Sequence, residues 1–174
     1  MNLPNGLTIF RIIALPFCAW ALLKENGNDP TWQWIAWTSF FVVGVTDILD
    51  GRIARRRNQV SQLGIILDPI ADKAFIATAL IGLSYLEKIP WWVTILILFR
   101  EVSVTFLRFA VLKREVISAS QGGKVKTLLQ NFSVGLYVLP LPTSLYLPRD
   151  ILLGVAIFLT LSTGFQYFRS VIRK

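Results

Sequence analysis

The sequence contains no histidine, one cysteine and one methionine among its 174 residues. Without histidine, the chain has no imidazole metal ligand and lacks the side chain that most often acts as a base near neutral pH. The single cysteine, Cys18, excludes an internal disulfide, and its apolar neighbours favour a buried small side chain. Any metal must therefore be held by carboxylates, and a carboxylate is also the expected base.

Charged residues are few as well, at 16% of the chain, whereas hydrophobic residues make up 54%. A soluble domain carries about 25% charged residues. The mean hydropathy is +0.58, and six tryptophans suit a protein that needs anchors at membrane interfaces. This balance favours an integral membrane protein that crosses the bilayer several times.

Six apolar stretches approach the length of a membrane-spanning helix, which is about 20 residues. We expect these helices at residues 7–23, 32–48, 65–86, 90–112, 127–147 and 151–168. Pro140 and Pro142 predict an irregular end of the fifth helix, and Pro148-Arg149-Asp150 is typical of a helix start. The expected fold is all-α, with residues 1–174 forming one domain of six transmembrane helices.

The basic residues, which give a net charge of +8, are distributed unevenly along this pattern. The first, third and fifth loops contain only Lys24, Lys88 and Arg149. The second and fourth loops and the C-terminal tail contain Arg52, Arg55, Arg56, Arg57, Lys113, Arg114, Lys124, Lys126, Arg169, Arg173 and Lys174. Because basic loops tend to stay in the cytoplasm, we expect both termini there. The net positive charge is therefore explained by basic residues on the cytoplasmic side of the membrane, and we expect no nucleic-acid partner.

Four aspartates interrupt the apolar pattern at the predicted ends of the second and third helices. Asp47 and Asp50 are three residues apart, and Asp68 and Asp72 are four apart, so each pair shares a helix face. Ionisable groups at membrane depth are costly and indicate function by default. Four converging carboxylates repel one another unless cations lie between them, and oxygen donors favour Mg²⁺, Mn²⁺ or Ca²⁺. For either pair alone, solvated carboxylates at a helix end are the alternative.

The residues around these aspartates suit a phosphate-containing ligand. Gly51 and Gly64 allow close approach of backbone or ligand, and the planar donor group of Arg55 matches phosphate oxygens. Residues 47–72 match the pattern D-x2-D-G-x2-A-R-x8-G-x3-D-x3-D at every specified position. The stretch therefore resembles the signature of the CDP-alcohol phosphatidyltransferase family, which is far more specific than an isolated glycine motif.

The resemblance implies a homodimeric membrane enzyme whose six helices surround a polar cavity open to the cytoplasm. Two divalent cations, Mg²⁺ or Mn²⁺, would be held by Asp47, Asp50, Asp68 and Asp72, and Asp72 would also be the general base. The residues expected to bind CDP-diacylglycerol are Asn5, Thr8, Asp50, Gly51, Ala54, Arg55, Ser61 and Gly64. Helix capping is the alternative role for Asn5 and Thr8.

Residues 4–11, Arg100-Glu101 and residues 123–127 resemble the branch of the family that uses glycerol 3-phosphate as acceptor. The phosphate of this acceptor needs cationic contacts, for which the candidates are Arg100, Arg108, Lys124 and Lys126. Arg100 and Glu101 could instead form a neutralising internal network, and the two lysines could serve topology and attract anionic lipid.

The expected reaction transfers the phosphatidyl group of CDP-diacylglycerol to glycerol 3-phosphate and releases CMP, as a step of phospholipid synthesis. We expect it in a bacterial inner membrane, among membrane lipids, with the active site facing the cytoplasm. Inositol phosphate, serine and phosphatidylglycerol are the alternative acceptors. A divalent-cation transporter would also place acidic residues in a membrane. It would not require the phosphate-binding features of residues 51–55.

Overall fold

The computed structural model describes the backbone of residues 3–56, 62–111 and 121–172, and within these the side chains of residues 6–46, 67–106 and 127–165. The regular secondary structure of the described ranges is all helical, with six α-helices and two short 3-10 segments joined by turns. The predicted all-α class is thus confirmed for these residues. The chain divides into two compact units, Met1–Lys88 with Val138–Pro140, and Ile89–Tyr137 with Leu141–Lys174.

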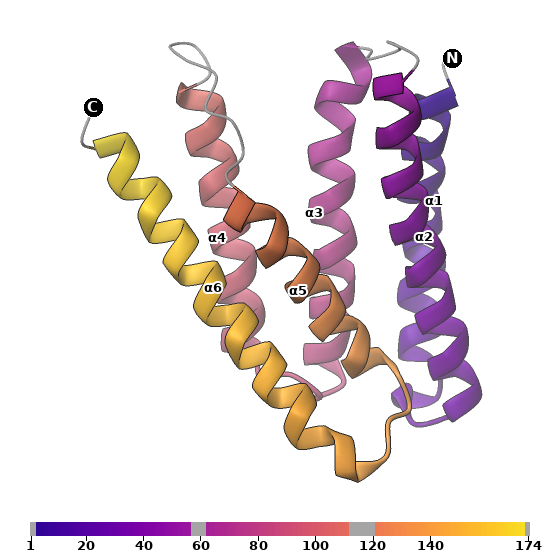
Figure 1. Ribbon diagram of the computed structural model, residues 1–174. Helices are drawn as coiled ribbons and strands as arrows, with labels where there is room; N and C mark the ends of the chain where they lie inside the picture. Colours follow the sequence, from indigo (N-terminus) through magenta and orange to yellow (C-terminus); the bar gives the residue numbers. More distant parts are fainter. Residues whose placement is uncertain (1–2, 57–61, 112–120, 173–174) are drawn as a thin grey trace. The chain divides into compact units, whose positions relative to one another are not determined.

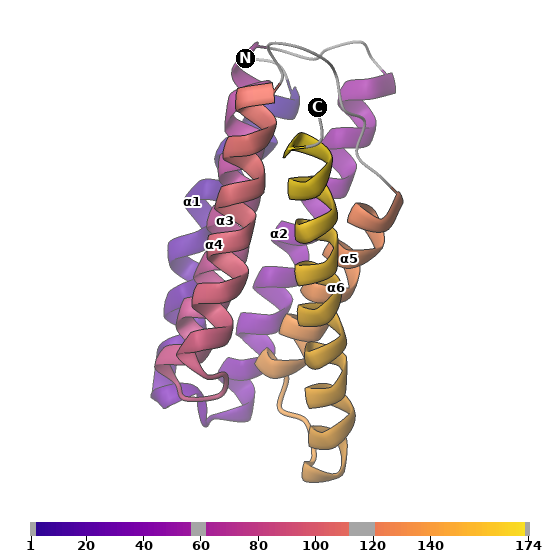
Figure 2. The ribbon, with the colours of Figure 1, turned by 90° about the vertical axis from the view of Figure 1, so that its left-hand side faces the viewer.

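The first unit is a group of three long helices. In chain order its elements are α1 (Leu3–Leu23), η1 (Lys24–Gly27), α2 (Pro30–Arg56) and α3 (Gln62–Tyr85). The α1 helix packs against both α2 and α3 (Figure 1, Figure 2). Its approach to α3 is close because Gly82 has no side chain, since a Cβ there would lie 2.6 Å from Leu22 Cδ2. Cys18 is buried in this unit, as predicted.

The turn between α1 and α2 is fixed by Gly27, whose φ of +64° is an unfavourable conformation for other residues. Its carbonyl oxygen accepts hydrogen bonds from the side-chain amide of Gln33 and from Lys88 Nζ, the latter at 3.0 Å. These contacts join the turn to the start of α2 and to the end of α3. Hydrogen bonds to Gly27 therefore link the end of α1 to the start of α2 and to the residues that follow α3.

Asp29 caps the start of α2. Its Oδ1 accepts hydrogen bonds from the backbone N–H groups of Thr31 at 2.7 Å and Trp32 at 3.2 Å. These bonds stabilise the ionised carboxylate, and the bond from Trp32 contributes most. The pKa of Asp29 therefore lies below its ordinary value of 3.8.

The second unit contains the remaining helices. They are α4 (Trp91–Val111), α5 (Gln121–Val138), η2 (Thr143–Leu145) and α6 (Tyr146–Ile172). The α4 helix packs against α6. The prediction for the fifth helix was wrong at its end, because α5 stops at Val138 rather than at residue 147. Pro140 and Pro142 have no N–H to continue the helix and restrict the residues before them.

The start of the sixth helix was also predicted too late. The α6 helix begins at Tyr146, so Pro148 falls within its first turn, where a proline is tolerated because that turn needs no N–H donor. Nearby, Asp150 Oδ1 accepts a hydrogen bond from the Tyr137 hydroxyl at 2.7 Å and one from Arg149 Nε at 2.9 Å. The Arg149 guanidinium lies 4.0 Å from the centre of the Tyr137 ring. This cluster joins the end of α5 to the start of α6.

Two stretches of the described residues are long and apolar enough to cross a membrane, Gly6–Gly27 and Thr143–Phe165. They support a membrane protein. The α3 and α4 helices carry charged residues within their apolar stretches, including Asp68 and Asp72 in α3 and Arg100 in α4. Six transmembrane spans, and the side of the membrane on which the termini lie, stay predictions.

Candidate active site

The aspartate motif lies near the end of α2 and near the start of α3, as the sequence predicted. Asp47 and Asp50 precede the end of α2 at Arg56, and Asp68 and Asp72 follow the start of α3 at Gln62. The side chains of the first pair lie outside the described residues, whereas those of the second pair are described. The α3 helix places Asp68 and Asp72 four residues apart, on one face.

The α1 helix supplies polar partners to both of these carboxylates. Thr8 Oγ1 donates a hydrogen bond to Asp68 Oδ1 at 2.9 Å. Arg11 Nη1 donates to Asp72 Oδ1 at 3.4 Å, and Arg11 Nη2 lies 3.8 Å from Asp68 Oδ1. The same Nη2 donates to Thr8 Oγ1 at 3.5 Å. One guanidinium thus reaches two carboxylates that lie a helical turn apart.

Burial divides this cluster into an inner and an outer part. The side chain of Arg11 is only 4% exposed, whereas those of Asp68 and Asp72 are 54% and 58% exposed. A buried charge is costly unless it is paired, so the burial of Arg11 depends on these carboxylates. The carboxylates themselves keep surface that a ligand can reach.

The described carboxylates have the chemistry of a divalent-cation site. Carboxylate oxygens are the donors that Mg²⁺ and Mn²⁺ prefer, and both side chains are about half exposed. Among the residues that the structure describes, no three His, Cys, Asp or Glu side chains gather as a metal-binding group. The side chains of Asp47 and Asp50, the other two predicted ligands, fall outside that search. Asp68 and Asp72 therefore fit one half of the predicted metal site.

Among the residues predicted to bind CDP-diacylglycerol, Thr8 is the only one whose side chain the structure describes. It lies inside α1 rather than at its start, so it does not cap the helix. Its hydroxyl is buried and engaged with Asp68. The structure gives no side-chain description for Asn5, Gly51, Ala54, Arg55, Gly64, Arg108, Lys124 and Lys126, and Ser61 lies wholly outside the described residues.

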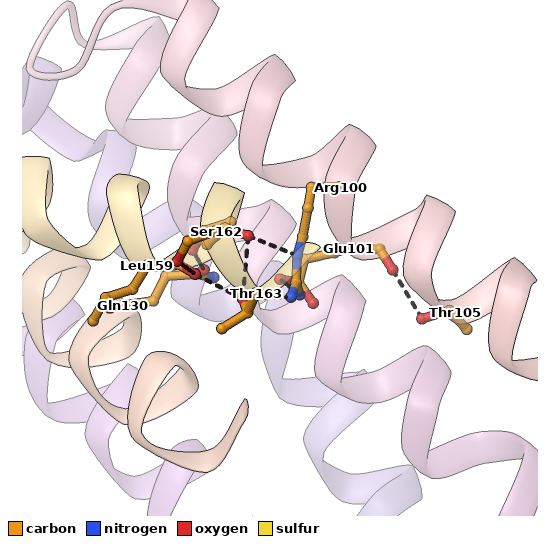
Figure 3. A network of polar contacts seen from close by, with 8 residues as sticks. Arg100, Glu101, Thr105, Gln130, Leu159, Ser162 and Thr163 are labelled. Carbon is orange, nitrogen blue, oxygen red and sulfur yellow. Dashed lines mark hydrogen bonds and ion pairs between the residues drawn. The ribbon is translucent and has the colours of Figure 1, made fainter. Parts of the chain in front are cut away.

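Arg100, a predicted ligand of the acceptor phosphate, joins α4 to α6. Its Nε donates to the backbone carbonyl of Thr160 at 3.1 Å, and its Nη2 donates to Thr163 Oγ1 at 2.9 Å. Its Nη1 forms an ion pair with Glu101 Oε1 at 3.1 Å. Figure 3 shows this network between the two helices. The alternative predicted for Arg100 and Glu101, an internal neutralising network, is present in the structure.

Two further residues of α6, Thr160 and Gly164, shape the surroundings of Arg100. Thr160 Oγ1 donates to the Gln130 side-chain oxygen at 3.3 Å, and both side chains are buried, so α5 is joined to the same point. Gly164 faces Arg100 directly, because a Cβ at this position would lie 3.2 Å from Arg100 Nε. A larger residue at 164 would push against the guanidinium.

Comparison with known proteins decides the family. The model of the CDP-alcohol phosphatidyltransferase family matches residues 1–162. The chain belongs to this family. The resemblance drawn from the aspartate motif is thereby confirmed, and the match extends from the motif to both units of this phosphatidyltransferase.

Individual relatives cover nearly the whole phosphatidyltransferase chain. A probable phosphatidylglycerophosphate synthase of Mycobacterium tuberculosis is 44% identical over 172 residues, which are 99% of this chain and 82% of that protein. A CDP-diacylglycerol–glycerol-3-phosphate 3-phosphatidyltransferase of Rickettsia bellii is 39% identical, over 97% of this chain and 94% of that protein. A CMP-forming cardiolipin synthase of Streptomyces coelicolor is 36% identical over 114 residues, covering 66% of this chain and 53% of that protein.

Among the described residues, Arg11 contacts Asp68 and Asp72 but was omitted from the site prediction. Its partner Asp72 lies 61 positions away in the sequence, so no local spacing connects it to the aspartates. One signal was available, because Arg11 is the only charged residue of α1. A lone charge in an apolar helix indicates a buried partner or a functional site.

Proposed function

We propose that this chain transfers the phosphatidyl group of CDP-diacylglycerol to glycerol 3-phosphate, giving phosphatidylglycerophosphate and CMP. The observation that carries the proposal is the half-exposed pair Asp68 and Asp72, held by α1 at the last two positions of the family motif. The relatives that match this chain over almost its full length have names that refer to this reaction. The cardiolipin synthase matches over a shorter part of both chains. This difference favours glycerol 3-phosphate over phosphatidylglycerol as acceptor.

In the proposed reaction, a hydroxyl oxygen of glycerol 3-phosphate forms a bond to the phosphorus that carries diacylglycerol. The bond from that phosphorus to the oxygen of CMP breaks, and CMP leaves. Asp72 accepts the proton of the attacking hydroxyl, because a half-exposed carboxylate is accessible to it and the chain has no histidine. Asp68, four residues earlier on the same helix face, lies beside the reacting phosphate in this proposal.

The proposed site binds two divalent cations, Mg²⁺ or Mn²⁺, through Asp47, Asp50, Asp68 and Asp72. When bound, such cations offset the negative charge of the pyrophosphate and of the departing CMP. We assign the binding of CDP-diacylglycerol to residues of α1, α2 and α3 and of the segment between the last two. These are Asn5, Thr8, Asp50, Gly51, Ala54, Arg55, Ser61 and Gly64.

The acceptor phosphate is assigned to Arg108, Lys124, Lys126 and Arg100. The described contacts of Arg100 support a second role for this residue. Three of its nitrogen atoms bind α6 or Glu101, so its contribution to the site includes holding α4 against α6. A kinetic test of Arg100 separates these two roles.

The proposed enzyme is a homodimer in a bacterial inner membrane, with six spans and a cavity that opens to the cytoplasm. The basic loops support this orientation, because the charged donor and acceptor headgroups would then be reached from the side where Arg52, Arg55 and Lys124 lie. The apolar stretches Gly6–Gly27 and Thr143–Phe165 support membrane insertion.

An acceptor panel tests the proposed function. Purified protein in lipid–detergent micelles is given CDP-diacylglycerol, Mg²⁺ and one labelled acceptor: glycerol 3-phosphate, inositol phosphate, serine or phosphatidylglycerol. We expect CMP release and a labelled lipid product with glycerol 3-phosphate alone. A product from another acceptor would overturn the assigned substrate. Folded protein that releases no CMP with any acceptor, but carries Mn²⁺ into proteoliposomes, would be a transporter.

A further inference from the structure

We propose that Arg11 is a positioning residue of this active site, which orients Asp68 and Asp72 from the buried side of α1. This inference rests on the proposed function, because it assigns Arg11 a role in presenting the two carboxylates to the reaction. It concerns a residue that lies outside the aspartate motif and on a different helix.

The geometry carries the inference. The two terminal nitrogens of one guanidinium divide between the two carboxylates, with Nη1 3.4 Å from Asp72 Oδ1 and Nη2 3.8 Å from Asp68 Oδ1. The planar, forked arrangement of these donors suits two acceptors that lie a helical turn apart. Thr8, three residues before Arg11 and on the same side of α1, adds a hydrogen bond to Asp68.

Three described contacts reach the Oδ1 atoms of the two carboxylates. Arg11 contacts Oδ1 of both Asp68 and Asp72, and Thr8 donates to Oδ1 of Asp68. This arrangement restrains the rotation of each carboxylate about its side chain, while more than half of each side chain stays exposed. Ligand groups held in this way by neighbouring residues are better oriented, and removing such a neighbour typically weakens metal binding or activity about 10- to 100-fold.

The role assigned here is distinct from charge neutralisation. A lysine at position 11 would keep the positive charge, but a single ammonium group cannot copy the planar fork that reaches both carboxylates. If Arg11 only neutralised its surroundings, Arg11→Lys would leave the site unchanged. If it positions the two carboxylates, the same substitution weakens metal binding and turnover. Because the charge is kept, repulsion of a bound cation by residue 11 stays similar in both proteins.

Three quantities are measured for wild type and Arg11→Lys. Mn²⁺ binding is followed without substrates, from the electron paramagnetic resonance signal of free Mn²⁺. The thermal midpoint is measured without metal, and kcat is measured from CMP release. Arg149→Lys is the matched control, because Arg149 also pairs with an aspartate, at 2.9 Å, but lies outside the site.

We expect Arg11→Lys to raise the dissociation constant for Mn²⁺ about tenfold and to lower kcat by at least as much, and Arg149→Lys to change neither. Folded Arg11→Lys protein with wild-type Mn²⁺ affinity and kcat would overturn the inference, even if its thermal midpoint fell. If Arg11→Lys does not fold, Thr8→Val removes the hydroxyl that Arg11 and Asp68 share. Weaker Mn²⁺ binding in that variant then supports the inference, and unchanged binding overturns it.

The Mn²⁺ measurement also separates this inference from the proposed function. It needs no acceptor, so weaker Mn²⁺ binding by Arg11→Lys supports the positioning role even if another acceptor is found. Wild-type protein that fails in the acceptor panel but binds Mn²⁺ through Arg11-dependent carboxylates would overturn the assigned reaction alone.

Discussion

The guanidinium of Arg11 on α1 lies 3.4 Å from the carboxylate of Asp72 on α3, across 61 positions of sequence. This contact connects the first helix to the residue proposed as general base. It explains why a buried arginine is stable in an otherwise apolar helix, since its charge is paired. The packing of α1 against α3 sets the distance between the Arg11 guanidinium and the Asp72 carboxylate, so the geometry of the site depends on this packing.

Arg100→Gln is expected to weaken the packing of α4 against α6. The substitution removes the hydrogen bonds to the Thr160 carbonyl and the Thr163 hydroxyl and the ion pair with Glu101. Leaving such part-buried partners unsatisfied costs roughly 1–3 kcal/mol. Because a protein of this size loses about 2–4 °C per kcal/mol, the thermal midpoint should fall by several degrees.

The kinetics of Arg100→Gln decide between its two assigned roles. A stabilising role predicts a KM for glycerol 3-phosphate within about threefold of wild type in the folded protein. A tenfold or larger increase in KM with an unchanged thermal midpoint would show that Arg100 mainly binds the acceptor phosphate. Arg149→Lys serves as control, because Arg149 lies in a separate cluster with Asp150 and Tyr137.

Gly164→Ala and Gly154→Ala form a matched pair on α6. A Cβ at 164 would lie 3.2 Å from Arg100 Nε and 3.3 Å from its Cγ, whereas a Cβ at 154 would have no neighbour within 4 Å. Alanine favours a helix over glycine by about 1 kcal/mol. We therefore expect Gly154→Ala to keep or raise the thermal midpoint, and Gly164→Ala to give a lower midpoint than Gly154→Ala. Equal midpoints would mean that Arg100 moves aside without cost.

The cap of α2 predicts a dependence of stability on acidity. The folded-state pKa of Asp29 lies below its ordinary value of 3.8, mainly because of the hydrogen bond from Trp32 N–H. The ionised cap therefore stabilises the folded state fully above the ordinary pKa, and this contribution is lost as the pH falls through the lowered folded value. In Asp29→Asn the side chain has no such titration, so the wild-type and variant midpoints should differ less at pH 3 than at pH 6. A constant difference across this range would contradict the assignment.

Local patterns predicted the helices better than their junctions. The four aspartates of the motif do lie near the end of α2 and the start of α3, because their spacing and the hydropathy around them are local properties. The end of α5 was placed too late, at residue 147 instead of Val138, although Pro140 and Pro142 predicted an irregular end there. The pairing of Arg11 with Asp72 depends on how α1 packs against α3, which no spacing along the chain encodes.

For Arg100, too, the sequence suggested possible roles but did not predict the contacts of the side chain. Its sequence context suggested a phosphate ligand, and its neighbour Glu101 suggested an internal network. Only the tertiary structure shows that the carbonyl of Thr160 and the hydroxyl of Thr163 occupy its donors. The motif therefore names candidate residues for the chemistry, whereas the contacts that hold Arg100 appear only in the tertiary structure.

The most direct test compares CMP release by wild type and Asp72→Asn, with CDP-diacylglycerol, Mg²⁺ and glycerol 3-phosphate. Asp29→Asn is the control, because its carboxylate caps α2 and lies outside the site. Loss of a general base lowers turnover by about 10²–10⁴-fold, so we expect CMP release that depends on acceptor and metal in wild type and control, and a drop of this size in Asp72→Asn. Wild-type turnover in folded Asp72→Asn would contradict the account.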